Sequence, residues 1–225
     1  MTQQYDILLT TLNARYIHSA FGLRYLLANL EELESKTKVI EFTIQEQTLN
    51  IAEHLLQHQP KIIGFSVYIW NIREISDIVT VIKQISPDTV IVLGGPEVGH
   101  YPDVPDICEL ADFVISGPGE KSFRELCRQI LDKARPETKY LDGIATELAE
   151  LQLPYHLYNE EDIRNRLIYV EASRGCPFKC EFCLSALDKW MPYGNAACVT
   201  LNSSIGPLTS RSPPAFAFWS FFWSV

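Results

Sequence analysis

Val90-Ile91-Val92-Leu93-Gly94-Gly95-Pro96-Glu97 is the stretch that decides the fold. Four consecutive apolar residues are followed at once by a glycine pair, which is a turn signal. A run that is apolar at every position, rather than at alternate positions, indicates a strand that is buried on both faces. Such strands are typical of parallel sheets with helices packed on both sides.

The first 135 residues repeat this pattern, with apolar runs alternating with segments of helical periodicity. The expected strands are 5–12, 38–43, 61–68, 89–93 and 113–116. The expected helices are about 17–34, 49–59, 72–85, 105–110 and 121–133. The pattern therefore predicts one α/β domain over residues 1–135, a doubly wound five-stranded parallel sheet of the Rossmann or flavodoxin-like kind.

Composition narrows the classes of function. The chain has 225 residues, a net charge of −9, and hydrophobic and charged fractions of 47% and 21%, as in an ordinary globular protein. The negative charge argues against nucleic acid as a partner, because phosphate binding requires clustered Lys and Arg. The first residues, Met1–Asp6, lack the basic and apolar regions of a signal peptide, so we expect a cytoplasmic protein.

The pattern changes after residue 135. Residues 136–166 are polar and loosely patterned and are expected to be a linker, whereas 167–193 begin a second domain with a strand at 167–172. Residues 194–225 contain a single charged residue, Arg211, among Ser, Pro, Phe and Trp, with no helical or strand period. We expect this tail to be disordered or out of frame, and Ser and Pro interrupt it too often for a membrane span.

Three cysteines stand close together in the second domain. Cys176, Cys180 and Cys183 have the spacing C-x3-C-x2-C, and Gly175 before them permits a tight turn. Three thiolates on one loop could ligate three irons of a cubane cluster. A zinc knuckle or a chance cluster is the alternative, although a zinc site would normally show a fourth ligand. Cys108 and Cys127 lie in apolar helical segments and are expected to be small buried hydrophobes.

Ser173-Arg174-Gly175-Cys176-Pro177-Phe178-Lys179-Cys180-Glu181-Phe182-Cys183 resembles the signature loop of the radical SAM superfamily. The resemblance implies a [4Fe–4S] cluster held by the three cysteines, with S-adenosylmethionine on the fourth iron. It implies cleavage of that cofactor to a 5′-deoxyadenosyl radical, with an electron donor such as flavodoxin or ferredoxin. In the family the aromatic residue before the last cysteine, here Phe182, lies near the adenine; packing in the core is the other interpretation of Phe182.

Four segments are expected where the predicted strands end, at the edge at which open α/β sheets bind ligands. They are Thr10-Thr11-Leu12-Asn13, Ser66-Val67-Tyr68-Ile69-Trp70, Gly94-Gly95-Pro96-Glu97 and Gly117-Pro118-Gly119-Glu120. Small hydroxyl residues and glycines at strand ends permit close approach by a bulky planar ligand with a phosphate-bearing tail. Each glycine pair alone is equally consistent with an ordinary turn.

With the cysteine loop, these segments resemble the cobalamin-binding domain of B12-dependent radical SAM proteins, over about residues 5–193. The resemblance implies that cobalamin is a cofactor, with these contacts: Thr10, Thr11, Asn13, Ser66, Val67, Gly94, Gly95, Pro96, Glu97, Gly117 and Glu120. Some cobalamin domains use the histidine of Asp-x-His-x-x-Gly as a cobalt ligand, but residues 13–22 do not fit that pattern. His18 is expected to cap or pack a helix.

The resemblance implies methyl transfer or other radical chemistry by a radical SAM enzyme. Only about 40 residues follow the cysteine loop, whereas the resemblance implies several further βα units, so the chain is expected to be a fragment that lacks most of the barrel. Two alternatives remain open: a cobalamin-binding module that catalyses nothing, and the inactive product of a truncated gene. No feature of the sequence indicates the substrate.

Overall fold

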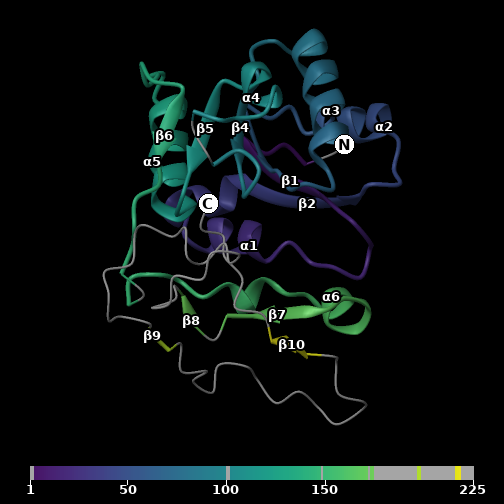
Figure 1. Cartoon of the computed structure of the whole chain (residues 1–225), viewed down its shortest axis with the longest axis vertical. Coiled ribbons are helices and arrows are strands. Elements are labelled where there is room, and N and C mark those ends of the chain that lie inside the picture. The colour runs from purple at the N-terminus through teal and green to yellow at the C-terminus, as the bar shows by residue number, and fades with distance from the viewer. Residues whose placement is uncertain are drawn as a thin grey trace.

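The computed structural model describes residues 3–99, 102–147, 149–171, 173–174, 197–198 and 216–218 (Figure 1). The strands of the main sheet are β1 (Ile7–Asn13), β2 (Thr37–Thr43), β3 (Ile62–Ser66), β4 (Val90–Gly94), β5 (Phe113–Ser116) and β6 (Tyr140–Asp142). Around them lie α1 (Phe21–Ala28), η1 (Glu31–Lys36), α2 (Thr48–Leu56), α3 (Ile72–Ile85), α4 (Ile107–Leu110) and α5 (Gly119–Leu131). The elements that follow are η2 (Pro154–Leu157), α6 (Glu160–Asn165), β7 (Ile168–Val170), β8 (Ser173–Arg174), β9 (Ala197–Cys198) and β10 (Phe216–Phe218).

The main sheet is parallel throughout, with the strand order β2-β1-β3-β4-β5-β6. After β2 the chain returns to the other side of β1, so the order reverses between β1 and β3. Loops that leave neighbouring strands at such a reversal diverge and open a crevice outside the carboxyl ends of the strands, which is where these folds bind ligands. The predicted parallel α/β architecture is confirmed, and it puts the crevice beside Thr11 and Ser66.

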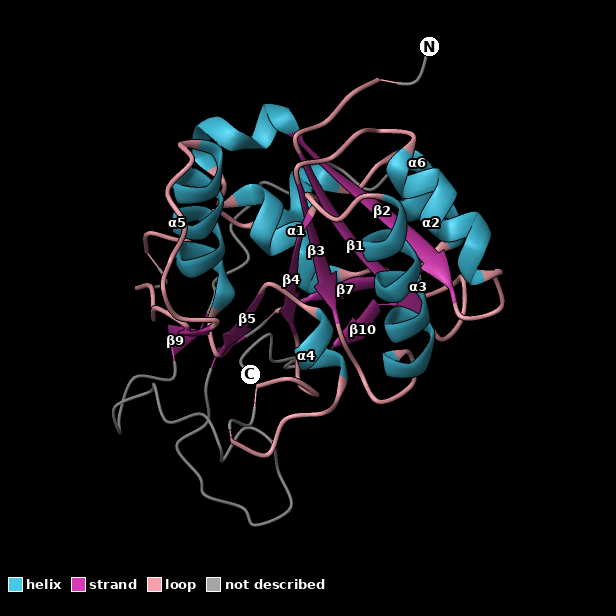
Figure 2. Ribbon diagram, turned by 90° about the horizontal axis from the view of Figure 1, so that it is seen from above, coloured by secondary structure: helices cyan, strands magenta, loops and turns pink. Residues whose placement is uncertain are grey.

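Two apolar layers hold the helices against the sheet. One joins β1, β3 and β4 to α2, α3 and α4, and the other joins the opposite face to α1 and α5. Figure 2 shows α5 on one side of the strands and α2 and α3 on the other. All seven residues of β1 and all five of β3 and β4 are buried. The continuous apolar runs therefore report burial on both faces, as predicted.

The sheet has six strands among the described residues, not the five predicted. The sixth, β6, lies within the predicted linker and pairs with β5 through Ile115 and Leu141. It has only three residues, none of them buried. A short edge strand joins a sheet through backbone hydrogen bonds and needs no apolar run, so periodicity did not reveal it. The predicted linker 136–166 also contains η2 and α6.

The first helix is shorter than predicted. α1 covers Phe21–Ala28 instead of about 17–34, and η1 follows it. The Asn29 side chain donates to the Tyr25 carbonyl and accepts from the Gln152 amide, and Glu31 takes a left-handed φ of 52°. These contacts end the helix, because the chain leaves the right-handed region there. At its other end, residues 17–20 bond to β7 and to Glu41 instead of continuing the helix.

A buried ion cluster joins α6 to the sheet domain. The Arg24 guanidinium contacts Glu41 at 2.6 Å and Asp162 at 3.0 Å. Arg166 adds ion pairs to the same two carboxylates, at 3.1 and 3.4 Å. Burial opposes the charge on Arg24, but Glu41, Tyr158 and Asp162 outweigh it and raise the pKa of Arg24. Residues 159–166 are therefore held against the first domain by charges that are nearly removed from water.

The structure also differs from the expectation for the tail at five residues. β10 pairs parallel with β7, and β9 pairs antiparallel with β8, although the sequence indicated no regular structure there. The other residues of 194–225 lie outside the described part of the chain. Among the described residues, no helix is both long enough and apolar enough to cross a membrane.

Candidate functional site

The four predicted segments meet at the carboxyl edge of the sheet. Ser66 pairs with Gly94 at the ends of β3 and β4, and Thr11 of β1 donates its hydroxyl to the Ser66 carbonyl at 2.8 Å. Gly117 follows the end of β5. Parallel strands end at one edge, so the register brings these segments together as predicted. The Thr10 hydroxyl lies deeper, buried against the Ile40 carbonyl at 2.7 Å.

Asn71, which the sequence analysis did not single out, fixes the ends of β1 and β3 together. Its side-chain amide donates to the Thr11 hydroxyl, the Leu12 carbonyl and the Ser66 carbonyl at 3.1–3.3 Å. Its carbonyl accepts from the Tyr68 amide at 2.8 Å. The side chain is fully buried, so these contacts are costly to lose. An asparagine immediately before the helical pattern 72–85 was the available signal, but its partner Thr11 across the sheet is not local in sequence.

Ser66 presents a buried hydroxyl at this point. Its side chain is 1% exposed, and within the described part of the chain its Oγ has no hydrogen-bond partner. Buried hydroxyls in folded proteins are nearly always paired, because an unpaired one loses its bonds to water without replacement. A hydroxyl left unpaired at the switch point of an α/β sheet is therefore a feature that a bound ligand would satisfy.

Gly95 has a backbone that only glycine adopts without strain. Its φ is 109°, and an added Cβ would lie 2.5 Å from the Val67 carbonyl oxygen. The Val67 amide donates to the Gly94 carbonyl at 2.8 Å, so the two loops lie directly against each other. Val67 is buried, whereas Pro96 and Glu97 are partly exposed at the rim. Gly95 is therefore required by the close approach of two backbones, which an ordinary turn would not need.

The loop after β5 also contains a glycine with a positive φ. Gly117 has a φ of 90°, and α5 starts two residues later. Glu120, in the first turn of α5, is 2% exposed. A carboxylate there is favoured by the partial positive charge of the helix N-terminus. The fourth predicted segment therefore belongs to the same edge, with its acidic side chain directed inward.

Two aromatic side chains lie beside the buried hydroxyl. Tyr68 and Trp70 stack with ring centroids 4.5 Å apart and planes 7° apart. Trp70 donates its indole N–H to the Leu12 carbonyl at 3.3 Å and is 44% exposed, and Ile69 between the two is 74% exposed. An exposed apolar surface next to a polar crevice suits a large ligand with a flat apolar face.

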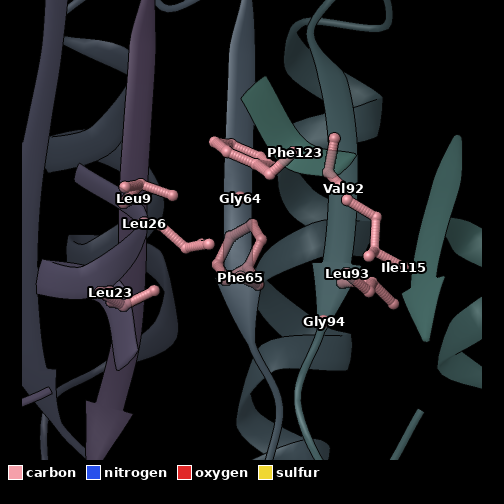
Figure 3. Close-up of a pocket in the computed structure, with 10 residues that line it drawn as sticks. All are labelled: Leu9, Leu23, Leu26, Gly64, Phe65, Val92, Leu93, Gly94, Ile115 and Phe123. Atoms are coloured by element: carbon pink, nitrogen blue, oxygen red, sulfur yellow. The ribbon is translucent and has the colours of Figure 1, made fainter. Parts of the chain in front are cut away.

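A small cavity lies under the edge, between the sheet and helices α1 and α5 (Figure 3). Gly64 is at its centre, with Leu9 and Phe123 on either side, each close to where a Cβ of residue 64 would be. The cavity measures about 10 Å³, which is about the space of one water molecule. Its walls are apolar apart from the backbone. An aromatic ring could enter only if Phe123 or the leucines moved.

The histidines do not form a metal site. His18 Nδ1 lies 2.5 Å from the Tyr169 hydroxyl of β7, so His18 packs against β7. It does not cap α1, whose N-cap is Ala20. His58 Nδ1 contacts the Gln3 carbonyl, and the nearby His54 has a pKa lowered by burial and by His58. Among residues 3–171, apart from the two gaps at 100–101 and 148, no group of three or more potential metal ligands occurs.

Cys108 and Cys127 are buried, as predicted, and burial raises the pKa of the Cys108 thiol to about 11. Burial raises the pKa of the Cys127 thiol more than it raises the pKa of Cys108. Both thiols are therefore protonated at neutral pH and act as small apolar groups. The predicted cluster ligands Cys176, Cys180 and Cys183, and the predicted adenine contact Phe182, lie outside the described residues.

Comparison with known proteins identifies the domain. Residues 7–127, more than half of the chain, match the B12 binding domain family. The chain belongs to that family. The matched residues run from the start of β1 to the last turns of α5, and they include the four loops at the carboxyl edge. The residues that match the family therefore include the edge at which the strand order predicts ligand binding. The Rossmann-like fold class is confirmed.

Relatives that match part of this chain are named as methyltransferases. An uncharacterized methyltransferase of Pyrococcus horikoshii is 28% identical over 190 residues, covering 74% of this chain and 40% of that protein. The cobalamin-dependent radical SAM methyltransferase TokK of Streptomyces tokunonensis is 27% identical over 154 residues, covering 56% and 22%. A cobalamin-binding protein from Desulfitobacterium hafniense superposes with a TM-score of 0.40 at 17% identity, covering 56% of this chain and 58% of that one. The chain thus spans less than half of either methyltransferase.

Proposed function

We propose that this chain binds cobalamin at the carboxyl edge of its sheet and forms the N-terminal part of a cobalamin-dependent radical SAM methyltransferase. One observation carries the first half: the Ser66 hydroxyl is buried without a partner at the switch point of a domain that belongs to the B12-binding family. The second half rests on the cysteine motif and on the relatives, of which two are methyltransferases.

The residues at the edge fit a corrinoid. Ser66 offers a hydroxyl that can donate or accept, and Gly95 lets the Val67 backbone pack directly against it, which keeps the loops after β3 and β4 close together. Tyr68 and Trp70 offer an apolar surface, whereas the first turn of α5 already carries the buried Glu120 carboxylate. Thr11 and Asn13 hold the neighbouring loop, because Thr11 bonds to Ser66 and Asn13 bonds to Glu41 at 2.8 Å.

The loop after β1 does not carry the Asp-x-His-x-x-Gly pattern, so we expect no cobalt ligand from it; its histidine, His18, bonds through Nδ1 to Tyr169. When bound, the corrinoid would supply the methyl group, and a cluster on Cys176, Cys180 and Cys183 would supply the electron that cleaves S-adenosylmethionine. This chain's own residues bind and orient: Ser66 and the glycine loops hold the ligand, and Asn71 keeps β1 and β3 aligned beneath it.

A cobalamin-binding module without catalysis is the second candidate, because the family match covers residues 7–127 and does not include the cysteine motif. The two candidates share the corrinoid site and differ in the cluster. Iron bound after anaerobic reconstitution, together with cleavage of S-adenosylmethionine by a reduced flavodoxin or ferredoxin, would favour the enzyme. Cobalamin binding without iron would favour the module.

The Ser66→Ala variant tests the corrinoid site. We expect it to weaken hydroxocobalamin binding about 3- to 10-fold, the effect of one hydrogen bond. The stability of the ligand-free chain should stay within about 0.5 kcal/mol, because the hydroxyl has no protein partner to lose. Titration followed by visible absorbance measures the affinity, and urea unfolding measures the stability.

Thr37→Val is the matched control for that experiment. The Thr37 hydroxyl is also buried, but it lies at the opposite edge of the sheet and donates to the Leu33 carbonyl at 2.8 Å. Its loss should cost about 1 kcal/mol of stability and leave the affinity unchanged. Equal cobalamin affinity in wild type and Ser66→Ala would show that Ser66 does not contact the ligand. A wild-type chain that does not change the cobalamin spectrum at all would refute the proposed function.

A further inference from the structure

The loop between β1 and α1 is held by a strand from outside the matched family domain. The Leu167 amide, just before β7, donates to the Ile17 carbonyl at 2.8 Å. The Ser19 hydroxyl donates to the Leu167 carbonyl at 2.9 Å. These two bonds join segments that are about 150 residues apart in sequence. Figure 1 shows α6 and β7 next to α1, at the end of the molecule to which the β1–α1 connection runs.

Tyr169 of β7 extends this contact into the candidate site. Its hydroxyl lies 2.5 Å from His18 Nδ1, and the two rings stack with centroids 6.3 Å apart. Burial raises the pKa of Tyr169, and the nearby Tyr68 phenol raises it further. One side chain from β7 is therefore close to two loops of the crevice, the loop after β1 through His18 and the loop after β3 through Tyr68.

The middle of the β1–α1 loop has two further contacts from the same outside segment: the Tyr16 hydroxyl donates to Glu161 at 2.8 Å, and the Arg166 guanidinium lies 4.7 Å from the centre of the Tyr16 ring. Arg15, Tyr16 and Ile17 are exposed, so burial of apolar surface does not fix them. Inside the loop, His18 donates its amide to the Arg15 carbonyl at 3.1 Å and accepts from Asn13 at 3.0 Å. A loop with few buried apolar contacts opens at a low free-energy cost unless side-chain hydrogen bonds hold it. The contacts to residues 167–169 supply such bonds.

We propose that Tyr169 is a positioning residue for the cobalamin site, acting through His18 to fix the β1–α1 loop at the carboxyl end of β1. The inference rests on the proposed function. It means that the cofactor-binding unit extends beyond residue 127, where the family match ends, to β7. It also means that β7, which leads toward the cysteine motif, is aligned with the wall of the cobalamin site by the Tyr169–His18 bond together with the two bonds of Leu167.

Two variants of the full chain test this role. Tyr169→Phe keeps the ring and removes the hydroxyl, and His18→Ala removes its partner. Each is expected to weaken hydroxocobalamin binding about 3- to 10-fold, and the double variant no further, because both break the same bond. Amide exchange of residues 14–20 in the ligand-free chain should quicken by a similar factor. The visible spectrum of the bound corrinoid should not change, since His18 is not a cobalt ligand.

Tyr155→Phe is the matched control, because the Tyr155 hydroxyl lies in the same segment and accepts from the Glu171 amide instead of contacting the loop. It should change neither the affinity nor the exchange of residues 14–20. Unchanged loop exchange in Tyr169→Phe, or additive effects in the double variant, would overturn the inference. Faster amide exchange of residues 14–20 with unchanged hydroxocobalamin affinity would show that the β1–α1 loop is not part of the cobalamin site. If wild type binds no cobalamin, the proposed function fails, and exchange alone then decides whether Tyr169 fixes the loop.

Discussion

Arg24→Met is expected to destabilise the chain by about 3 kcal/mol, because it leaves the buried carboxylates of Glu41 and Asp162 without their main cation. Removing one partner of a buried ion pair is costly, since the remaining charge keeps its desolvation penalty and loses the attraction that offset it. Methionine preserves most of the volume of the arginine stem. The loss of unfolding free energy therefore reflects the missing charge more than the missing packing. Arg166 still contacts both carboxylates, which keeps the expected loss at the lower end of the usual range.

Arg164→Met is the control for Arg24→Met. The Arg164 side chain pairs with Glu160 on the same helix, α6, but the two are 74% and 85% exposed. An exposed pair of this kind contributes about 0.5 kcal/mol or less. Urea unfolding followed by circular dichroism should therefore separate the two variants clearly. If Arg24→Met cost no more than Arg164→Met, α6 would not be held by this cluster.

The sheet could be predicted because each central strand is apolar at every position. Burial on both faces leaves a continuous run, as in Val90-Ile91-Val92-Leu93, and such a run can be identified without any knowledge of its neighbours. β6 has no such run and is held by its backbone, so its place in the sheet could not be predicted. The glycine pair after β4 was also found from the sequence, but its close approach to Val67 depends on the neighbouring loop.

The site was predicted at the level of segments and not of contacts. Strand ends gather by topology, so Ser66, Gly95 and Gly117 could be assigned to one edge from the order of strands and helices. Asn71 and Tyr169 could not, because their partners lie 60 and 151 residues away in sequence. Hydrogen bonds between distant segments leave no periodic signal. The same reason explains why Tyr169 could not be predicted as the partner of His18; His18 was expected to be a cap or packing residue, and it packs on β7.

The largest chemical effect is expected at the cysteine motif. Anaerobic reconstitution with iron and sulfide should give the full chain a broad visible absorption and about four irons per chain. Changing Cys176, Cys180 and Cys183 together to Ala should abolish both, because a cubane cluster without protein thiolates has nothing to retain it. Iron analysis and absorbance measure the effect, and neither requires catalytic activity.

Cys198→Ala is the control, because it removes a cysteine that lies outside the motif and should leave the iron content unchanged. If the triple variant kept its iron, the motif would not be the cluster site. If zinc, with no iron, copurified with wild type and was lost in the triple variant, the zinc-knuckle alternative would be correct. Because the cobalamin domain is complete without these cysteines, the triple variant should bind hydroxocobalamin as wild type does. Loss of iron with cobalamin binding retained would thus show two separate cofactor sites on one chain.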